Sequence, residues 1–86
     1  MESLKSKVEK YLERAKPLFS DLQVNPAMTG SPNNKAAKLL DTAMRYYSDA
    51  QHFYAKGEYL DALTALEYAE GWMDAGIEIG LLMRVE

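Results

Sequence analysis

The sequence has no cysteine, which removes two common ways of stabilising a small protein. Neither a disulfide nor a zinc site with cysteine ligands can form, so these 86 residues must rely on packing. Such a chain suits a reducing compartment, and we expect a cytoplasmic location. The length fits a single domain over residues 1–86.

Long apolar runs and an excess of basic residues are also missing. No run approaches the roughly 20 apolar residues that cross a bilayer, so we expect no membrane partner. Ten Lys and Arg stand against thirteen Asp and Glu, and the pI near 5.1 disfavours nucleic acid as a partner. The one histidine, His52, leaves little for nucleophilic catalysis. We therefore assign no catalytic, cofactor-binding or metal-ligating residue.

Residues that favour β-strands are scarce, since three Val, two Ile and three Thr stand against eleven Ala and eleven Leu. The class predicted is all-α. A Pro/Gly-rich loop at about residues 23–33 and a turn at Lys56-Gly57 divide the chain. Ser31 is the expected N-cap of the second helix, with Pro32 at its first position. Apolar periodicity then predicts a three-helix up-down-up bundle with helices at roughly 3–22, 32–56 and 58–83.

The last predicted helix is apolar on nearly two sides. Beyond an ordinary core stripe it carries Tyr68, Trp72 and Ile79, here called the Trp72 patch, which three helices would leave in water. Exposed apolar patches on small proteins usually mark interfaces. We therefore predict a non-enzymatic module that binds a protein partner or a second copy of itself.

Three glycines lie inside the same predicted helix, at Gly71, Gly76 and Gly80. A glycine in a helix interior costs about 1 kcal/mol relative to alanine. Two explanations remain open from the sequence. Either another segment approaches the helix closely at these positions, or the helix ends earlier than the periodicity indicates.

Charge is distributed unevenly, with a net +3 over residues 1–38 and −6 over residues 39–86. Four acids of the last helix, Glu67, Glu70, Asp74 and Glu78, form an acidic strip in which neighbouring like charges repel. One hypothesis is that Lys7, Lys10 or Arg14 of the first helix neutralises this strip. The other is that the strip docks a basic partner or a cation.

The second hypothesis defines a candidate binding site for a small ligand or a divalent cation. Its members, here called the four-acid set, are Asp49, Glu67, Glu70 and Asp74. Carboxylate oxygens are the ligands that hard divalent cations prefer. As an alternative to the interaction module, the protein would bind such a ligand, either alone or in an assembly that includes an enzyme.

Two segments of the chain resemble a known family. Residues 46–53 (YYSDAQHF) and 68–76 (YAEGWMDAG), with Gly57 between them and Gly80 after them, are similar to the pattern of the archaeal domain of unknown function 357. The resemblance covers about residues 40–82 and leaves out the first helix. It implies a short all-helical archaeal protein of unassigned activity. The matching positions are Tyr46, Asp49, Ala50, Phe53, Gly57, Tyr68, Ala69, Gly71, Trp72, Asp74, Gly76 and Gly80.

Overall fold

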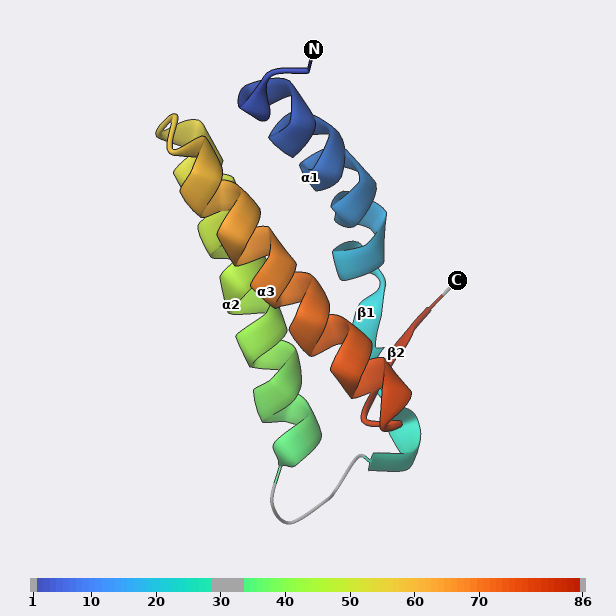
Figure 1. The fold of residues 1–86 in the computed structure, drawn as a ribbon. Helices are drawn as coiled ribbons and strands as arrows, with labels where there is room; N and C mark the ends of the chain where they lie inside the picture. Colours follow the sequence, from blue (N-terminus) through green and yellow to red (C-terminus); the bar gives the residue numbers. More distant parts are fainter. Residues whose placement is uncertain (1, 29–33, 86) are drawn as a thin grey trace.

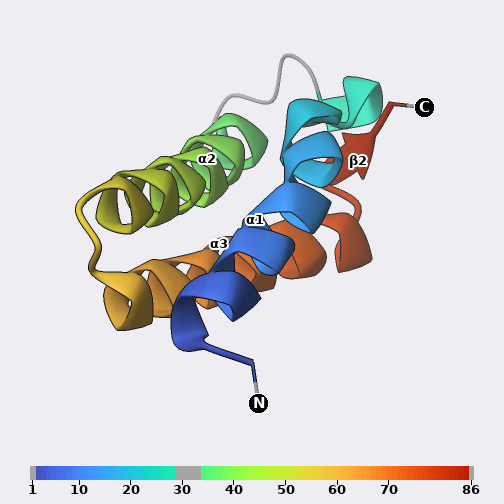
Figure 2. The same ribbon diagram turned by 90° about the horizontal axis from the view of Figure 1, so that it is seen from above.

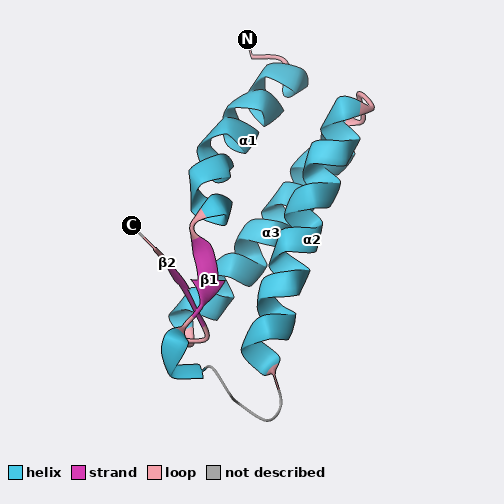
Figure 3. Ribbon diagram, turned by 180° about the vertical axis from the view of Figure 1, so that it is seen from behind, coloured by secondary structure: helices cyan, strands magenta, loops and turns pink. Residues whose placement is uncertain are grey.

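The computed structural model describes residues 2–28 and 34–85, most of which are helical (Figure 1). The helices are α1 (Leu4–Ser20), α2 (Lys35–Ala55) and α3 (Tyr59–Glu78), and a short 3-10 helix, η1, covers Pro26–Met28. Two short strands, β1 (Leu22–Val24) and β2 (Leu82–Arg84), form an antiparallel pair (Figure 3). The three expected helices are therefore present in this part of the chain, together with a strand pair that the composition did not predict.

Helices α2 and α3 form an antiparallel pair with the most extensive helix contact in the described structure. Glycine makes the reversal between them possible, because Gly57 has φ +79° and Glu58 N–H donates to the Phe53 carbonyl at 2.9 Å. The predicted turn is confirmed. Small side chains are buried on both helices, which lets the two backbones come close; they are Ala43, Ala50, Ala62, Ala65 and Ala69.

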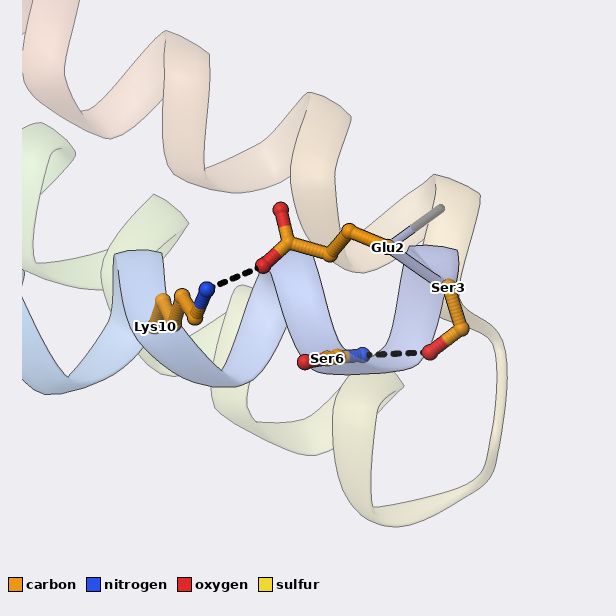
Figure 4. A network of polar contacts seen from close by, with 4 residues as sticks. All are labelled: Glu2, Ser3, Ser6 and Lys10. Atoms are coloured by element: carbon orange, nitrogen blue, oxygen red, sulfur yellow. Dashed lines mark hydrogen bonds and ion pairs between the residues drawn. The ribbon is translucent and has the colours of Figure 1, made fainter.

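Helix α1 packs on one side of this pair and runs in the same general direction as α3 (Figure 1 and Figure 2). Its buried residues are Val8, Ala15 and Phe19. The Phe19 ring stacks on Tyr47 of α2 with 4.5 Å between ring centroids, which anchors the C-terminal end of α1. At the other end, the Ser3 hydroxyl accepts a hydrogen bond from Ser6 N–H (3.1 Å), as Figure 4 shows.

The third helix ends five residues before the predicted residue 83. Gly80 has φ +81°, and Leu81 N–H donates to the Gly76 carbonyl at 2.9 Å, so a glycine C-cap stops the helix. The chain then turns back as β2 and pairs with β1, with Leu22 opposite Arg84 and Val24 opposite Leu82. The prediction of helix through residue 83 is wrong because Gly80 caps the helix rather than continuing it.

The other predicted boundaries shift by smaller amounts. Helix α1 covers Leu4–Ser20 rather than 3–22, because Leu22 begins a strand. Helix α2 covers Lys35–Ala55 rather than 32–56, and Asn34, with φ 48°, is its N-cap. The predicted cap at Ser31 and the proline at 32 lie outside the described residues.

Candidate functional site

The Trp72 patch lies on the outer face of α3. Tyr68 is 58%, Trp72 42% and Ile79 64% exposed, although all three side chains are large and apolar for most of their surface. Tyr68 also stacks on Tyr46 of α2, with 5.5 Å between the ring centroids, so its ring is held in place. The patch is therefore an exposed apolar surface at the edge where α2 meets α3, and the Tyr68 ring within it is held by stacking on Tyr46.

A shallow hollow of about 420 Å³ opens beside these aromatic rings. Gly71 lies within it, and a β-carbon built on Gly71 would meet no atom within 4 Å. The hollow is thus open at the point where one helix residue has no side chain. Its lining residues are Tyr46, Glu67, Tyr68, Gly71, Trp72 and Ala75.

The two other glycines resolve the question that the sequence left open. A β-carbon on Gly76 would lie 2.5 Å from Leu82 Cδ1 and 2.8 Å from Leu39 Cδ2, so any larger residue there would force these leucine side chains to shift. Gly80 ends the helix, as described above. Neither reason applies to Gly71, which nothing in the described structure approaches.

Three of the four acids predicted to form a ligand site line one groove. Glu67, Glu70 and Asp74 form its α3 side, and a volume of about 720 Å³ separates them from α1. The α1 side consists of Lys7, Tyr11, Arg14, Ala15 and Leu18, and Leu63 and Gly71 complete the lining. The basic face of α1 is therefore opposite the acidic strip, as one hypothesis predicts.

Ion pairs do not bridge this groove within the described residues. The pairs present there are Lys10 with Glu2 (Figure 4) and Lys56 with Glu58, and both lie outside the groove. The bases that line it lie over the Tyr11 ring instead, with Lys7 Nζ 5.7 Å and Arg14 Cζ 4.6 Å from its centroid. Arg14 acts on the strip through space, not through a direct salt bridge.

The carboxyl group of Glu70 shows how incomplete this compensation is. Burial raises the pKa of Glu70 above its ordinary value, and the charges of Asp74 and Glu67 raise it further. The Arg14 guanidinium opposes this shift without reversing it. The groove therefore retains an excess of negative charge on its α3 side.

Asp49 is not part of this groove. It lines a different hollow between α2 and α3, together with Tyr46, Phe53 and Asp61. The four-acid set is therefore divided between two places, because Asp49 and Glu70 face opposite sides of the α2–α3 pair. In residues 2–28 and 34–85, no group of three or more His, Asp or Glu side chains could hold a metal ion. The structure thus offers no preassembled cation site there.

Sequence reasoning missed two features of this surface. The sequence marks Tyr46 only as a position of the family pattern, whereas in the structure its ring forms the α2 wall beside Tyr68. For Gly71 the sequence offers two explanations, close approach of another segment or an early helix end, and neither applies, because a β-carbon there would meet no atom within 4 Å and α3 continues to Glu78. Periodicity places both residues on the helix surface, but only the tertiary structure shows which neighbours they have.

The family described as "Protein of unknown function (DUF357)" matches residues 6–82. The chain belongs to this family. The match confirms the resemblance seen in the two motifs and also includes α1, where the sequence showed no motif. No curated protein matches the chain.

A solved relative supports the fold. The crystal structure of protein AF1782 from Archaeoglobus fulgidus, of the same DUF357 family, is similar with a TM-score of 0.74 and 22% identity. The alignment covers 95% of this chain and 93% of the other. The arrangement of helices is therefore shared with a family member of distant sequence. No helix in the described part of the chain has the length and apolarity needed to cross a membrane.

The residues that carry the family motifs divide into two groups in the structure. Some serve the fold, as Gly57, Gly76 and Gly80 do at turns and close contacts. Others lie at the surface of the α2–α3 edge, where they line the two hollows; these are Tyr46, Asp49, Phe53, Tyr68, Gly71 and Trp72. Of these, Tyr46 and Phe53 also pack against the buried core, whereas Tyr68 and Trp72 are exposed.

Proposed function

We propose that this DUF357 protein is a non-enzymatic interaction module whose contact surface is the Trp72 patch. The observation that carries the proposal is the exposure of Tyr68 and Trp72 on α3 and of Ile79 at its C-cap. Covering such side chains stabilises a complex by about 25 cal/mol per Å² of apolar surface, before the costs of association. The occupant is a protein partner or a second copy of the chain.

We also propose that residues 1–86 form a single domain. Its helices form an up-down-up bundle in which α3 provides the outer binding surface. A shared core supports this view, since Phe19 of α1, Tyr47 of α2 and Met73 of α3 belong to one buried cluster. The absence of cysteine supports a place in the reducing cytoplasm.

Few side chains are available for an enzymatic alternative. The chain has no cysteine, and its one histidine, His52, is exposed on α2. A serine nucleophile would need His52 as its base, and no pocket described above includes that residue. An interaction role requires no such arrangement.

Removing the indole ring of Trp72 tests the proposal directly. We expect Trp72→Ala to weaken self-association in sedimentation velocity, or to abolish capture of a partner by the tethered chain in an archaeal lysate. Leu4→Ala is the matched control, because Leu4 is 40% exposed and lies on α1, away from the patch. A strict monomer whose captured proteins are identical for wild type and both variants would refute the proposal.

The groove between α1 and α3 favours a second candidate function. We propose that a small ligand with a positively charged group would bind there, since Glu67, Glu70 and Asp74 line a volume of about 720 Å³. A ligand that binds the native state raises the melting temperature. If millimolar calcium, magnesium and manganese, and a small organic amine such as spermidine, leave the melting temperature unchanged, this candidate fails.

A further inference from the structure

We infer that the occupant of the Trp72 patch is a positively charged amphipathic helix of another protein, which lies along α3 over Gly71. The inference rests on the proposed function and specifies the chemistry of the partner. Its apolar side would cover Tyr68, Trp72 and Ile79. Its Lys and Arg residues would meet the acids on either side of the patch.

The shape of the patch fits a helix. From Tyr68 to Ile79 the residues follow α3 for about 16 Å at 1.5 Å per residue, so the exposed stripe runs along one axis. A helix laid along another helix covers such a stripe with one side chain per turn.

Gly71 allows that helix to approach closely. The distance between packed helix axes depends on the side chains at their contact, and Gly71 contributes none. Ala75, one turn later, is also small and lines the same hollow. The hollow of about 420 Å³ therefore provides a seat for one partner side chain between the ring of Tyr68 and the ring of Trp72.

The charge of α3 and of the hollows beside it favours a basic partner. Glu67 lines the hollow itself, and Asp61 lines the adjoining hollow beside Tyr68. Asp74 and Glu78 are exposed on the same helix, and α3 contains no Lys, Arg or His. The nearest bases of α1, Lys7 and Arg14, lie across the groove over Tyr11. Every charge on α3 beside the patch is therefore negative.

The same charges argue against a second copy as occupant. A two-fold contact places the same surface of each subunit against the other, so the acids of α3 would face acids. Like charges brought together at an interface suppress association. A basic helix from another protein would be attracted by the acids of α3, whereas a second copy of the chain would be repelled by them.

Helical probe peptides of defined charge test this inference on the whole chain. Each would have about 20 residues, enough to span about 30 Å as a helix. The three peptides share one Leu/Ala face and carry Lys, Gln or Glu on the flanks. Trp72 is the only tryptophan of the chain, so its fluorescence reports occupancy of the patch. We expect the Lys peptide to shift the emission to the blue and to bind about tenfold or more tightly than the Gln peptide at low salt.

Variants then test where on α3 the peptide binds. Gly71→Leu fills the hollow, and we expect it to weaken binding of the Lys peptide about tenfold or more. The variant should fold, because a β-carbon at Gly71 meets nothing, and its circular dichroism checks this. Ser48→Leu, at an exposed position on α2, is the matched control and should bind like wild type. Glu67→Gln should reduce both the affinity and its salt dependence, whereas Asp41→Asn on α2 should not.

The outcomes separate this inference from the function on which it rests. Equal binding of the Lys, Gln and Glu peptides, or unchanged binding by Gly71→Leu, would overturn the inference. Sedimentation of wild type as a Trp72-dependent dimer would overturn it too, since the occupant would be a second copy. In that case, or if a captured partner depends on Trp72 but is not basic, the proposed function stands. Only the absence of any Trp72-dependent contact refutes both.

Discussion

Gly71, Gly76 and Gly80 show that one residue type has three different consequences within ten positions. Gly80 adopts a positive φ that ends α3, and Gly76 leaves room for the Leu82 side chain. Gly71 does neither, because it sits in an open hollow beside Trp72. A helix residue that lowers stability without a packing reason points to a role outside the isolated fold.

Alanine substitutions at two of these glycines should have opposite effects. We expect Gly71→Ala to raise the free energy of unfolding by about 1 kcal/mol, the difference in helix propensity. Gly76→Ala should lower it, because the new β-carbon would lie 2.5 Å from Leu82 Cδ1. Urea unfolding followed by circular dichroism measures both. Two variants with the same sign of change would contradict this account of α3.

Glu70 should make the stability of the protein depend on pH. Burial first, and then Asp74 and Glu67, raise its pKa from an ordinary value of 4.5, so the folded state favours the protonated carboxyl. The stability that the protein gains from protonating Glu70 is fully present below the pKa that this group has in the unfolded chain. It is lost as the pH rises through the higher pKa of the folded state.

Glu70→Gln removes the charge that the fold disfavours. We expect the variant to be more stable than wild type at pH 7 by a few tenths of a kcal/mol, and the difference to disappear near pH 4. Urea unfolding at the two pH values measures this, with Glu13→Gln on the exposed side of α1 as control. A variant less stable than wild type at pH 7 would show that Arg14 compensates the charge fully.

At the scale of elements, the two short strands connect distant parts of the chain. Besides the pairing of β1 with β2, the Asn25 side chain donates to the Gly80 carbonyl at 2.9 Å, and Val85 N–H donates to the Asp21 carbonyl at 2.8 Å. These bonds tie the segment after α1 to the end of α3. The strand pair thus closes one end of the molecule, and Leu82 fills the space beside Gly76.

Leu82 should therefore contribute strongly to stability although it lies four residues from the C-terminus. It is 2% exposed, and we expect Leu82→Ala to reduce the free energy of unfolding by about 2–5 kcal/mol. Met83→Ala is the matched control on the same strand, because Met83 is exposed and should change stability by less than about 0.5 kcal/mol. Chemical denaturation of both variants measures the difference, and equal effects would exclude β2 as part of the core.

At the scale of the whole molecule, the helices are not equally attached. Helices α2 and α3 share a long contact, whereas α1 is held mainly at its C-terminal end by Ala15 and Phe19. Near its N-terminal end, Val8 is buried, and Tyr54 of α2 donates a hydrogen bond to Glu9 at the surface. The groove lies along α1 from Lys7 to Leu18 and is open between α1 and α3.

Amide hydrogen exchange should reveal this difference. We expect amides in residues 8–13 of α1 to exchange faster than those in residues 43–50 of α2, because local opening of α1 breaks fewer buried contacts. Residues 18–20 of α1, which include Phe19, serve as an internal comparison and should exchange more slowly than residues 8–13. Equal protection along α1 and α2 would mean that the groove does not loosen the molecule.

The uneven distribution of charge along the chain also produces an uneven distribution of charge on the folded molecule. The basic half and the acidic half meet across the groove, where Lys7 and Arg14 face Glu67, Glu70 and Asp74. The opposite edge, with Tyr46, Tyr68 and Trp72, has acids but none of these bases. The charged residues that line the hollows beside the Trp72 patch are therefore all acidic, whereas the groove is lined by both signs.

The sequence predicted the helices and the exposed patch because both depend on local periodicity. Apolar spacing located the three helices to within a few residues at most ends, and it placed Tyr68, Trp72 and Ile79 opposite the core stripe of α3. It could not predict the strand pair, because partners such as Leu22 and Arg84 lie about sixty residues apart in the chain and short strands leave no periodic signal. It also joined Asp49 to the acids of α3, which the packing separates.

The sequence by itself therefore determined the helical class and the apolar surface in excess of the core, which follow from a repeat of three to four residues, and the family, which follows from two local motifs. Tertiary structure alone decided what depends on neighbours far away in the chain. It brought β2 against Gly76, divided the four-acid set between two sides of α3, and left Gly71 open beside Trp72. The physical reason is that a side chain's periodicity fixes its direction on its own helix, whereas its partners depend on how the helices pack.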